Sequence, residues 1–540
     1  MTFKVVVADA VDKEGLELLE GDPEFKVVSV VEDASKLPTE LADAHALLVR
    51  SSTQVTADLM EKAPLLKVVG RAGIGIDNID VNAATRRGVA VVNAPGANTV
   101  SAAEHTIALL LALVRRVPWA MKSMAEGRWD RKQFAGTELR GKTLSLIGLG
   151  RIGAHVAKIA RSFGMEVAAF DPFLSADRAR DLRVELGTLE DVLKLADVIS
   201  LHAPSTETTH HIINEKTLAL VKPTAYLVNT ARGSLIDDQA LADAVKSGKL
   251  AGAALDVFDP EPLPDDSPLR NVDGIALTPH LAASTQEAQT RVSVEICRTV
   301  GDVLRTGDIG SAVNVPGVSG EVLTRSAEGL SLAREAGCLA GSLAGGRVQS
   351  IDVDFGTSDD AAAKAFMLSA VEGVLRSMGI GPVSLVNAGL LAEERSITVS
   401  RRVGRPKAGY ETTVGVKVQT SERSTEVVGA MVGPHQRRVI RIDDYDVDIP
   451  PGGNVLILKN RDVPGVIGKV GTVLGAAAVN IGFYHQSRKS NNGNEALAAI
   501  SVDHAPSLDV LNELKQMEEV IDVRYVGLET AGLPGQGDIA

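Results

Sequence analysis

The chain has 540 residues, more than one hydrophobic core organises, so we expect about three or four domains. Its composition, with 45% hydrophobic and 23% charged residues, is ordinary for a soluble globular protein and excludes disordered and fibrous classes. A net charge of −13, without long runs of Lys or Arg, argues against a nucleic-acid partner.

The cysteine content and the apolar runs bear on the compartment. The chain has two cysteines, Cys297 and Cys338, which excludes a disulfide scaffold and a Cys-rich metal site and fits a reducing environment. We expect no bound metal. The longest apolar stretch, residues 107–114, is much shorter than the roughly 20 residues of a membrane span. The N-terminal segment, interrupted by Asp9 and Asp12, is unlike a signal peptide. We therefore expect a cytoplasmic protein without a membrane partner.

The first two-thirds of the chain alternate between strand-like and helix-like segments. Residues 3–92 contain the β-branched runs FKVVVA, FKVVSV, ALLVR, LKVVG and VAVV. A second series over residues 143–278 contains TLSLI, EVAAF, DVISL, AYLVN, AGAALDV and GIALT. Both series are typical of βαβ units and predict two parallel sheets. Between them, residues 98–117 predict one long helix that is apolar on most faces, which we expect to be buried between domains or between subunits.

A glycine-rich loop, GLGRIG, follows the strand TLSLI and precedes the helical segment AHVAKIARSFG. In such a loop the first glycine permits a tight turn, the second lets a pyrophosphate approach the backbone, and the third lets the helix pack close to the strand. The phosphate charge is then stabilised by the unsatisfied N–H groups of the helix start. The pattern predicts a dinucleotide site formed by Gly148, Gly150, Arg151, Ile152 and Gly153.

An acidic residue, Asp171, ends the next predicted strand, EVAAF. Its carboxylate is placed to accept hydrogen bonds from the adenosine ribose hydroxyls. The same carboxylate would repel a 2′-phosphate, and neither Pro172 nor Phe173 supplies a compensating cation. We therefore expect NAD rather than NADP as the cofactor.

Three polar residues lie just beyond three later strands: Arg232 after AYLVN, Glu261 after AGAALDV and His280 after GIALT. Ligands of open α/β sheets bind outside the carboxyl ends of strands, so we expect all three at one crevice. Hydride transfer at a carbon that bears oxygen requires a proton acceptor, a group that tunes this acceptor, and a cation for a substrate carboxylate. These three side chains can supply those roles.

The motifs NTARG, DVFDPEP and TPH, with GLGRIG upstream, resemble those of the D-isomer-specific 2-hydroxyacid dehydrogenases in order and local context. The resemblance implies that His280 is the general acid/base, that Glu261 orients and charges its imidazole, and that Arg232 binds the carboxylate and carbonyl oxygen of the substrate. It also implies that Asp256 lies near the nicotinamide side of the cofactor.

The resemblance further implies an α/β fold of two flavodoxin/Rossmann-like parallel-sheet domains, with the cofactor domain inserted into the substrate domain. We expect the substrate domain to comprise residues 1–97 and 285–315 and the NAD-binding domain to comprise residues 98–284.

The sequence changes character after residue 315. VPGVSG is followed by a helical stretch and then by residues 395–450, which are rich in Val, Thr and Arg. Residues 316–452 resemble, by position and length, the α+β intervening domain of the long phosphoglycerate branch of the family. Residues 453–530 resemble an ACT domain, an amino-acid-binding module, in their βαββαβ order and in the motifs NRDVPG and VNI. The last residues, ending GLPGQGDIA, are expected to form a loose tail.

Several basic and polar residues match those that the phosphoglycerate branch uses for its substrate. Arg50, Arg71 and Asn98 match positions that bind the substrate phosphate, which suits the planar fork of arginine. Arg131 matches a residue that a neighbouring subunit supplies. The loop around Gly73 is expected to offer backbone N–H groups to the substrate carboxylate.

The reaction implied by the resemblance is oxidation of 3-phospho-D-glycerate to 3-phosphohydroxypyruvate with NAD, the first step toward L-serine. Two alternatives remain open. One is another D-2-hydroxyacid dehydrogenase, with hydroxypyruvate, glyoxylate or 2-oxoglutarate as the corresponding 2-oxo acid. The other is a non-catalytic regulator that senses NADH on the same fold.

The C-terminal module predicts regulation. Residues 462–465 form a turn that opens a helix, whose N–H groups and positive end suit the carboxylate of an amino acid. We expect L-serine to bind through Asn460, Asp462 and Asn480, at an interface between two modules of a homo-oligomer, either a dimer or a tetramer. The alternative is that Asp462 and Asn480 only cap turns.

Overall fold

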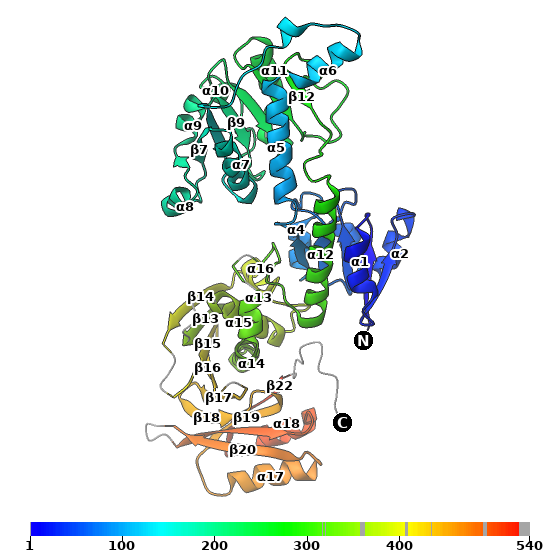
Figure 1. Ribbon diagram of the computed structural model, residues 1–540. Helices are drawn as coiled ribbons and strands as arrows, with labels where there is room; N and C mark the ends of the chain where they lie inside the picture. The colour runs from blue at the N-terminus through cyan, green and yellow to red at the C-terminus, as the bar shows by residue number, and fades with distance from the viewer. Residues whose placement is uncertain are drawn as a thin grey trace. The chain divides into compact units, whose positions relative to one another are not determined.

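The computed structural model describes residues 2–315, 317–318, 320–356, 362–405, 409–433, 435–489 and 494–528 (Figure 1). Its contacts divide the chain into two compact units. Unit 1 comprises Met1–Val11, Leu16–Asn93 and Ile296–Ala540, and unit 2 comprises Asp12–Gly15 and Ala94–Glu295. No helix within the described residues has the length and apolar character needed to cross a membrane.

Unit 1 begins with a five-stranded parallel sheet in the order β2-β1-β3-β4-β5. Every residue of β1, β3 and β5 is buried, as expected for parallel strands that are covered on both faces. The order is that of a flavodoxin-like sheet. Its strands are β1 (Phe3–Val7), β2 (Phe25–Ser29), β3 (Ala46–Val49), β4 (Val68–Arg71) and β5 (Ala90–Asn93). The intervening helices are α1 (Lys13–Glu20), η1 (Ala34–Lys36), α2 (Leu37–Leu41), α3 (Ala57–Glu61) and α4 (Val81–Arg86).

Unit 2 contains a seven-stranded sheet in the order β12-β11-β10-β9-β6-β7-β8, and all its pairs are parallel. This is the Rossmann order with one further strand, and it confirms the second predicted sheet. Its strands are β6 (Thr143–Ile147), β7 (Glu166–Phe170), β8 (Glu185–Leu186), β9 (Val198–Leu201), β10 (Tyr226–Asn229), β11 (Gly252–Leu255) and β12 (Ile275–Leu277). Its helices are α5 (Thr99–Val114), α6 (Val117–Ala125), η2 (Arg131–Phe134), α7 (Arg151–Ser162), α8 (Ala176–Asp181), α9 (Leu189–Leu195), α10 (Glu215–Leu218), η3 (Gly233–Leu235) and α11 (Asp238–Lys246); α12 (Gln286–Thr306) follows.

Helix α5 corresponds to the apolar helix predicted over residues 98–117, but it ends early, at Val114. Arg116 adopts a left-handed conformation with φ of 55°, and Pro118 occupies the first turn of α6, so the prediction of one continuous helix was wrong at this end. The buried residues of α5 pack with α7 and with strands β10 and β11. Much of its apolar surface is therefore covered by the sheet of its own unit.

A six-stranded sheet in the order β14-β13-β15-β16-β17-β18 follows in unit 1. Helices α14 and α15 pack against each other, and α14 also packs on β15 and β16. The two helices approach closely at Gly373 of α15, where a Cβ would lie 2.0 Å from the carbonyl oxygen of Arg334 on α14. This confirms the expected α+β domain. Its elements are α13 (Gly320–Arg325), α14 (Ala327–Ala344), β13 (Val348–Gly356), α15 (Ala363–Ser377), α16 (Ala388–Glu394), β14 (Thr398–Gly404), β15 (Thr413–Thr420), β16 (Ser424–Met431), β17 (Arg437–Ile442) and β18 (Tyr445–Ile449).

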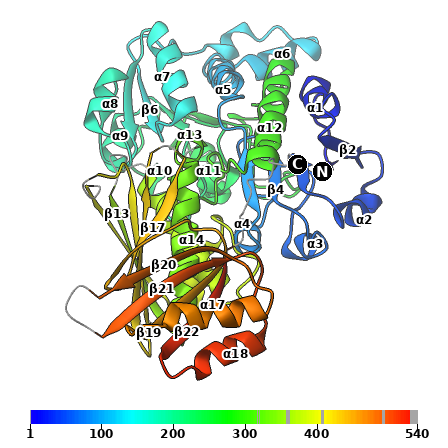
Figure 2. The same cartoon turned by 90° about the horizontal axis from the view of Figure 1, so that it is seen from below.

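The last module has the predicted βαββαβ order. Its antiparallel sheet runs β20-β21-β19-β22, and Figure 2 shows α17 and α18 side by side on one face of it. The core between helices and sheet contains Leu456, Leu458, Val470, Ile500 and Leu514. The elements are β19 (Gly453–Arg461), α17 (Val466–Ala476), β20 (Ile481–Arg488), β21 (Glu495–Val502), α18 (Leu508–Gln516) and β22 (Val520–Leu528). The expected tail, residues 529–540, lies outside the described residues.

Candidate active site

The glycine-rich loop joins β6 to α7 at the carboxyl edge of the seven-stranded sheet. Gly148 has φ of 95°, and a Cβ on Gly153 would lie 2.6 Å from the carbonyl oxygen of Gly148, so helix and strand approach closely here. A Cβ added to Gly150 would have no described atom within 4 Å, apart from those of its chain neighbours. That open side fits a pyrophosphate, which the N–H groups of the first turn of α7, where Arg151 and Ile152 lie, can hold.

Asp171 follows β7 directly beside this loop. Its Oδ2 accepts a hydrogen bond from the backbone N–H of Leu149 at 2.8 Å, and its Oδ1 accepts one from Phe173 at 2.9 Å. The carboxylate is thus fixed next to the pyrophosphate loop, where the ribose of a dinucleotide extends. The side chain of Phe173 is exposed and uncharged, so this residue offers no cation to a 2′-phosphate.

His202 follows β9 at the same edge and was missed by the sequence analysis. A Cβ on Gly148 would lie 2.8 Å from the carbonyl carbon of His202, so the histidine backbone forms one wall of the glycine loop. Its Nε2 lies 2.9 Å from Ser200 Oγ. Burial lowers the pKa of His202 to about 4, so the imidazole is neutral near pH 7. Its place just after the predicted strand DVISL was the signal that could have found it.

His280 and Glu261 form a hydrogen-bonded pair. His280 follows β12 and has φ of 53°; its Nδ1 lies 2.8 Å from Glu261 Oε2. The other carboxylate oxygen of Glu261 accepts a hydrogen bond from the backbone N–H of Phe258 at 3.0 Å. Because Glu261 engages Nδ1, Nε2 is the ring nitrogen that can reach a substrate.

The electrostatics of the pair favour its charged form. The hydrogen bond to Glu261 raises the pKa of His280 above its usual value, although burial and the nearby Arg232 oppose this shift. Burial acts to raise the pKa of Glu261, but the bond from His280 and the N–H of Phe258 outweigh it and hold that pKa below its ordinary value. The imidazole is therefore a stronger base than a free histidine.

Arg232 lies in a turn whose backbone is hydrogen-bonded by the side chain of Asn229. The fully buried Asn229 donates from Nδ2 to the carbonyl oxygen of Arg232 at 2.8 Å and accepts from the N–H of Ala231 at 3.0 Å. Gly233 lets this turn contact the loop that carries Glu261, because a Cβ there would lie 2.0 Å from the carbonyl carbon of Phe258. The predicted residues Arg232, Glu261 and His280 are thus brought together within unit 2.

Asp256 lies beneath the loop that carries His280. Its carboxylate is fully buried and accepts hydrogen bonds from the N–H groups of Leu281 and Ala282, at 2.8 and 2.9 Å. Thr278 Oγ1, at 2.5 Å, and His105 Nε2, at 3.1 Å, also contact it. Burial raises the pKa of this carboxyl, but these donors outweigh it and hold the pKa below its usual value. Its proximity to a nicotinamide stays a prediction.

Arg50 and Arg71 occupy the carboxyl edge of the five-stranded sheet in unit 1. Arg71 ends β4 and pairs in register with Val49 of β3, the residue before Arg50. The buried Asp9, at the end of β1, accepts from the N–H of Arg50 at 2.6 Å and so fixes that loop. A Cβ on Gly73 would lie 1.8 Å from Nη1 of Arg71, so this glycine leaves room for the guanidinium.

Asn98 and Arg131 both lie in unit 2. Asn98 precedes α5, and its Oδ1 is buried without a hydrogen-bond partner in the described part of the chain. Arg131 begins the short helix η2 and is exposed.

The residues predicted to bind serine differ in exposure. Asp462 lies in the turn before α17, and its Oδ2 is 2.7 Å from Nε of Arg488. Asn480 is exposed, and its N–H donates to Asp503 Oδ1 at 3.1 Å. Asn460 is fully buried, with Nδ2 donating to the carbonyl oxygen of Arg461. Of the three, only Asn460 is enclosed by its own module.

Comparisons with known proteins agree with this geometry. Residues 107–282 match the NAD-binding domain of D-isomer-specific 2-hydroxyacid dehydrogenases, residues 328–443 the D-3-phosphoglycerate dehydrogenase intervening domain, and residues 454–519 the ACT domain. The D-3-phosphoglycerate dehydrogenase of Synechocystis sp. is 38% identical over 97% of this chain and 95% of its own length, and that of Bacillus subtilis is 39% identical over 97% and 100%. The structure of D-lactate dehydrogenase from Aquifex aeolicus, complexed with NAD and lactic acid, is 31% identical, with a TM-score of 0.51, over 57% of this chain and 98% of that one.

Fold, site and comparisons together define an NAD-dependent dehydrogenase of D-2-hydroxy acids. Within this class of dehydrogenases, the matches to the intervening and ACT domains, and a relative that is matched over its full length, indicate the phosphoglycerate branch. The chain belongs to the D-3-phosphoglycerate dehydrogenase family.

Proposed function

We propose that Arg232, Glu261 and His280 are the catalytic residues with which this enzyme oxidises 3-phospho-D-glycerate to 3-phosphohydroxypyruvate, with NAD as the hydride acceptor, in the first step of L-serine biosynthesis. The observation that carries the proposal is the 2.8 Å contact between His280 Nδ1 and Glu261 Oε2 at the carboxyl edge of the NAD-binding sheet. The relatives that match along nearly their whole length bear the name of this activity.

The chemistry follows from the pair. His280 takes the proton of the C2 hydroxyl through Nε2, and Glu261 stabilises the imidazolium that results. Arg232 holds the substrate carboxylate and the developing carbonyl oxygen through charge-assisted bonds. NAD, when bound at the glycine-rich loop, supplies the hydride acceptor.

The wild-type assay that tests this proposal follows NADH absorbance with 3-phospho-D-glycerate and NAD as the only substrates. We expect steady NADH formation. NADH binding without any turnover on this or another D-2-hydroxy acid would instead favour the non-catalytic regulator.

Replacing Glu261 with Gln should move the pH dependence of the reaction to lower pH. The carboxylate raises the pKa of His280, so its loss lowers that pKa. Oxidation requires neutral His280, so the acid limb of the pH profile for oxidation should shift to lower pH. Reduction of the 2-oxo acid requires the imidazolium form, so the alkaline limb of the pH profile for reduction should also shift to lower pH. Profiles of kcat/KM in both directions check this, and a limb that stays in place would contradict the role of Glu261.

For the substrate phosphate we propose Arg50, Arg71 and Asn98, with Arg131 supplied by a neighbouring subunit and the carboxylate held by the loop at Gly73. Support comes from the register of β3 and β4, which places Arg50 and Arg71 on adjacent strand ends. Two guanidinium groups at one edge suit a dianion.

A homo-oligomer, dimer or tetramer, is supported by the apolar surface that precedes Arg131. Met121 and Met124 on α6 are 67% and 55% exposed, and Trp129 is 80% exposed. Large apolar side chains gathered on one short segment mark an interaction surface.

We propose domain limits and a compartment from the sequence. The limits are 1–97 with 285–315 for substrate, 98–284 for NAD, 316–452 for the intervening domain and 453–530 for the ACT domain. A cytoplasmic location is supported by the presence of only two cysteines.

We also propose that L-serine binds the ACT domain and lowers turnover without entering the catalytic site. The exposed Asn480 and the turn at Asp462, which opens the 11-residue helix α17, support this, since a helix start suits a carboxylate. The ammonium of serine would compete with Arg488 for Asp462.

Calorimetry should show L-serine binding to the wild-type protein and weaker binding to Asn480→Ala, with D-serine as the control ligand. A side-chain hydrogen bond to a charged group is worth about 1.5–3 kcal/mol, so affinity should fall by at least roughly tenfold. Absence of heat with wild type, or equal affinity in the variant, would end the serine proposal.

A further inference from the structure

The loop that carries His280 is tied to one carboxylate. The backbone oxygen of Asp256 accepts from the N–H of His280 at 2.9 Å, and the carboxylate of Asp256 accepts from the next two N–H groups, those of Leu281 and Ala282. His280 itself is left-handed, a conformation that a non-glycine residue keeps only where its surroundings fix it. Asp256 therefore fixes the backbone of the loop from which the His280 imidazole projects.

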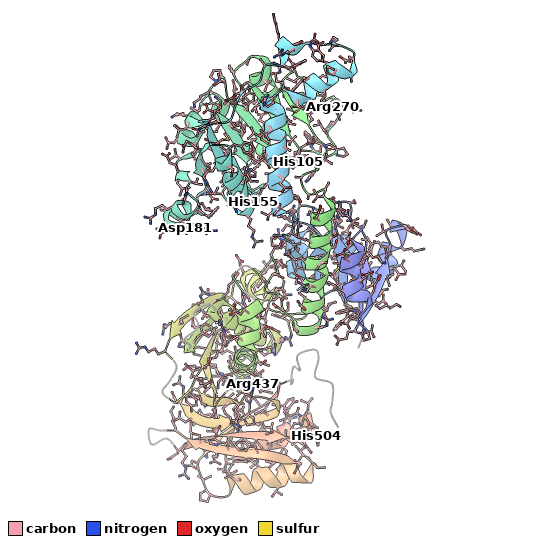
Figure 3. The ribbon with its side chains drawn as sticks, viewed as in Figure 1. His105, His155, Asp181, Arg270, Arg437 and His504 are labelled. Atoms are coloured by element: carbon pink, nitrogen blue, oxygen red, sulfur yellow. The ribbon has the colours of Figure 1, made fainter. Side chains whose placement is uncertain are left out.

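A histidine from a helix far away in the sequence contacts the same carboxylate. His105, on α5, places Nε2 at 3.1 Å from Asp256 Oδ1 and at 3.4 Å from Thr278 Oγ1, and Figure 3 marks it on this helix. Thr278 donates to the same Oδ1 at 2.5 Å. A carboxylate with no solvent exposure needs such donors to stay ionised, so His105 must carry its proton on Nε2.

We infer that His105 is a positioning residue for catalysis, which acts through Asp256 on the loop that presents His280. The inference rests on the proposed role of His280 as the general base. All the contacts lie within unit 2, so the network belongs to one compact body. The hydrogen bond with His105, together with those from Thr278 and the two backbone N–H groups, holds the pKa of Asp256 below its usual value although burial acts to raise it.

The test compares His105→Leu with His105→Gln. Leucine fills the space without a donor, whereas the amide nitrogen of glutamine takes the place of Nε2. His155→Leu, on α7 of the same unit, is the matched control (Figure 3). The readouts are kcat and kcat/KM for oxidation of 3-phospho-D-glycerate, and the calorimetric affinity for ADP-ribose, which occupies the glycine loop and Asp171 without a nicotinamide.

We expect His105→Leu to lose roughly 10- to 100-fold in kcat, the range for a lost hydrogen bond to a buried charged group, with ADP-ribose affinity unchanged. His105→Gln should recover to within about threefold of wild type, and His155→Leu should match wild type. Wild-type kcat in His105→Leu would overturn the inference. So would equal losses of activity and of ADP-ribose binding in both His105 variants, because they would show a purely structural role. If the wild type itself fails to oxidise the substrate, the proposed function fails instead.

Discussion

Replacing His280 with Ala should lower kcat by roughly 10²–10⁴-fold, the usual contribution of a general base. The reason is local: His280 Nε2 is the nitrogen that takes the hydroxyl proton, and its Nδ1 is already engaged by Glu261 at 2.8 Å. NAD affinity should remain near wild type, because the glycine loop and Asp171 lie on other strands of the sheet. Initial rates and a binding titration with NADH measure both quantities.

Two further variants sharpen this prediction. His280→Asn removes the base but tolerates the left-handed φ of 53°, so it separates the loss of a base from a distortion of the loop. His155→Ala on α7 is the control for a histidine of the same unit. Turnover in both His280 variants above half the wild-type rate would show that another residue is the base.

Replacing Arg71 with Ala should raise the KM for 3-phospho-D-glycerate by about 10- to 150-fold, since a charge-assisted bond is worth about 1.5–3 kcal/mol. Arg50→Ala should behave alike, because Arg50 directly follows β3 and Arg71 ends the adjacent strand β4 in register with it. The KM for an unphosphorylated D-2-hydroxy acid should change far less, because only the phosphate loses its partner. Steady-state kinetics on both substrates give this comparison.

Arg86→Ala is the matched control for the arginine variants. Arg86 lies on α4 of the same unit, and its Nε pairs with Glu394 Oε1 of α16 at 2.9 Å. It should leave both KM values unchanged. Equal losses on the two substrates in Arg71→Ala would indicate a folding defect and remove the phosphate role.

The sequence predicted the parts of the site that depend on local patterns. Strand, glycine loop and helix are contiguous at residues 143–162, and Asp171, Arg232 and His280 each follow a strand closely. Because the carboxyl ends of parallel strands meet at one sheet edge, their order along the chain was enough to place these residues together.

The buried supports of the site could not be predicted in this way. His105 and Asp256 are 151 positions apart, and only the packing of α5 on the sheet brings them to 3.1 Å. Asn229 ends strand β10, and the reason for its polar side chain appears only in the structure, where Nδ2 donates to the carbonyl oxygen of Arg232 in the following turn. Asn460, which was predicted to bind serine, is fully buried, a fact that depends on which face of β19 the helices cover.

Recognition of the substrate phosphate is tested by comparing kcat/KM for NAD reduction with 3-phospho-D-glycerate and with D-glycerate, the same hydroxy acid without its phosphate. Two guanidinium bonds to the phosphate predict a preference for the phosphorylated substrate of at least roughly 100-fold. Equal values for the two substrates, or a higher value for D-glycerate, would contradict 3-phospho-D-glycerate as the substrate of this enzyme.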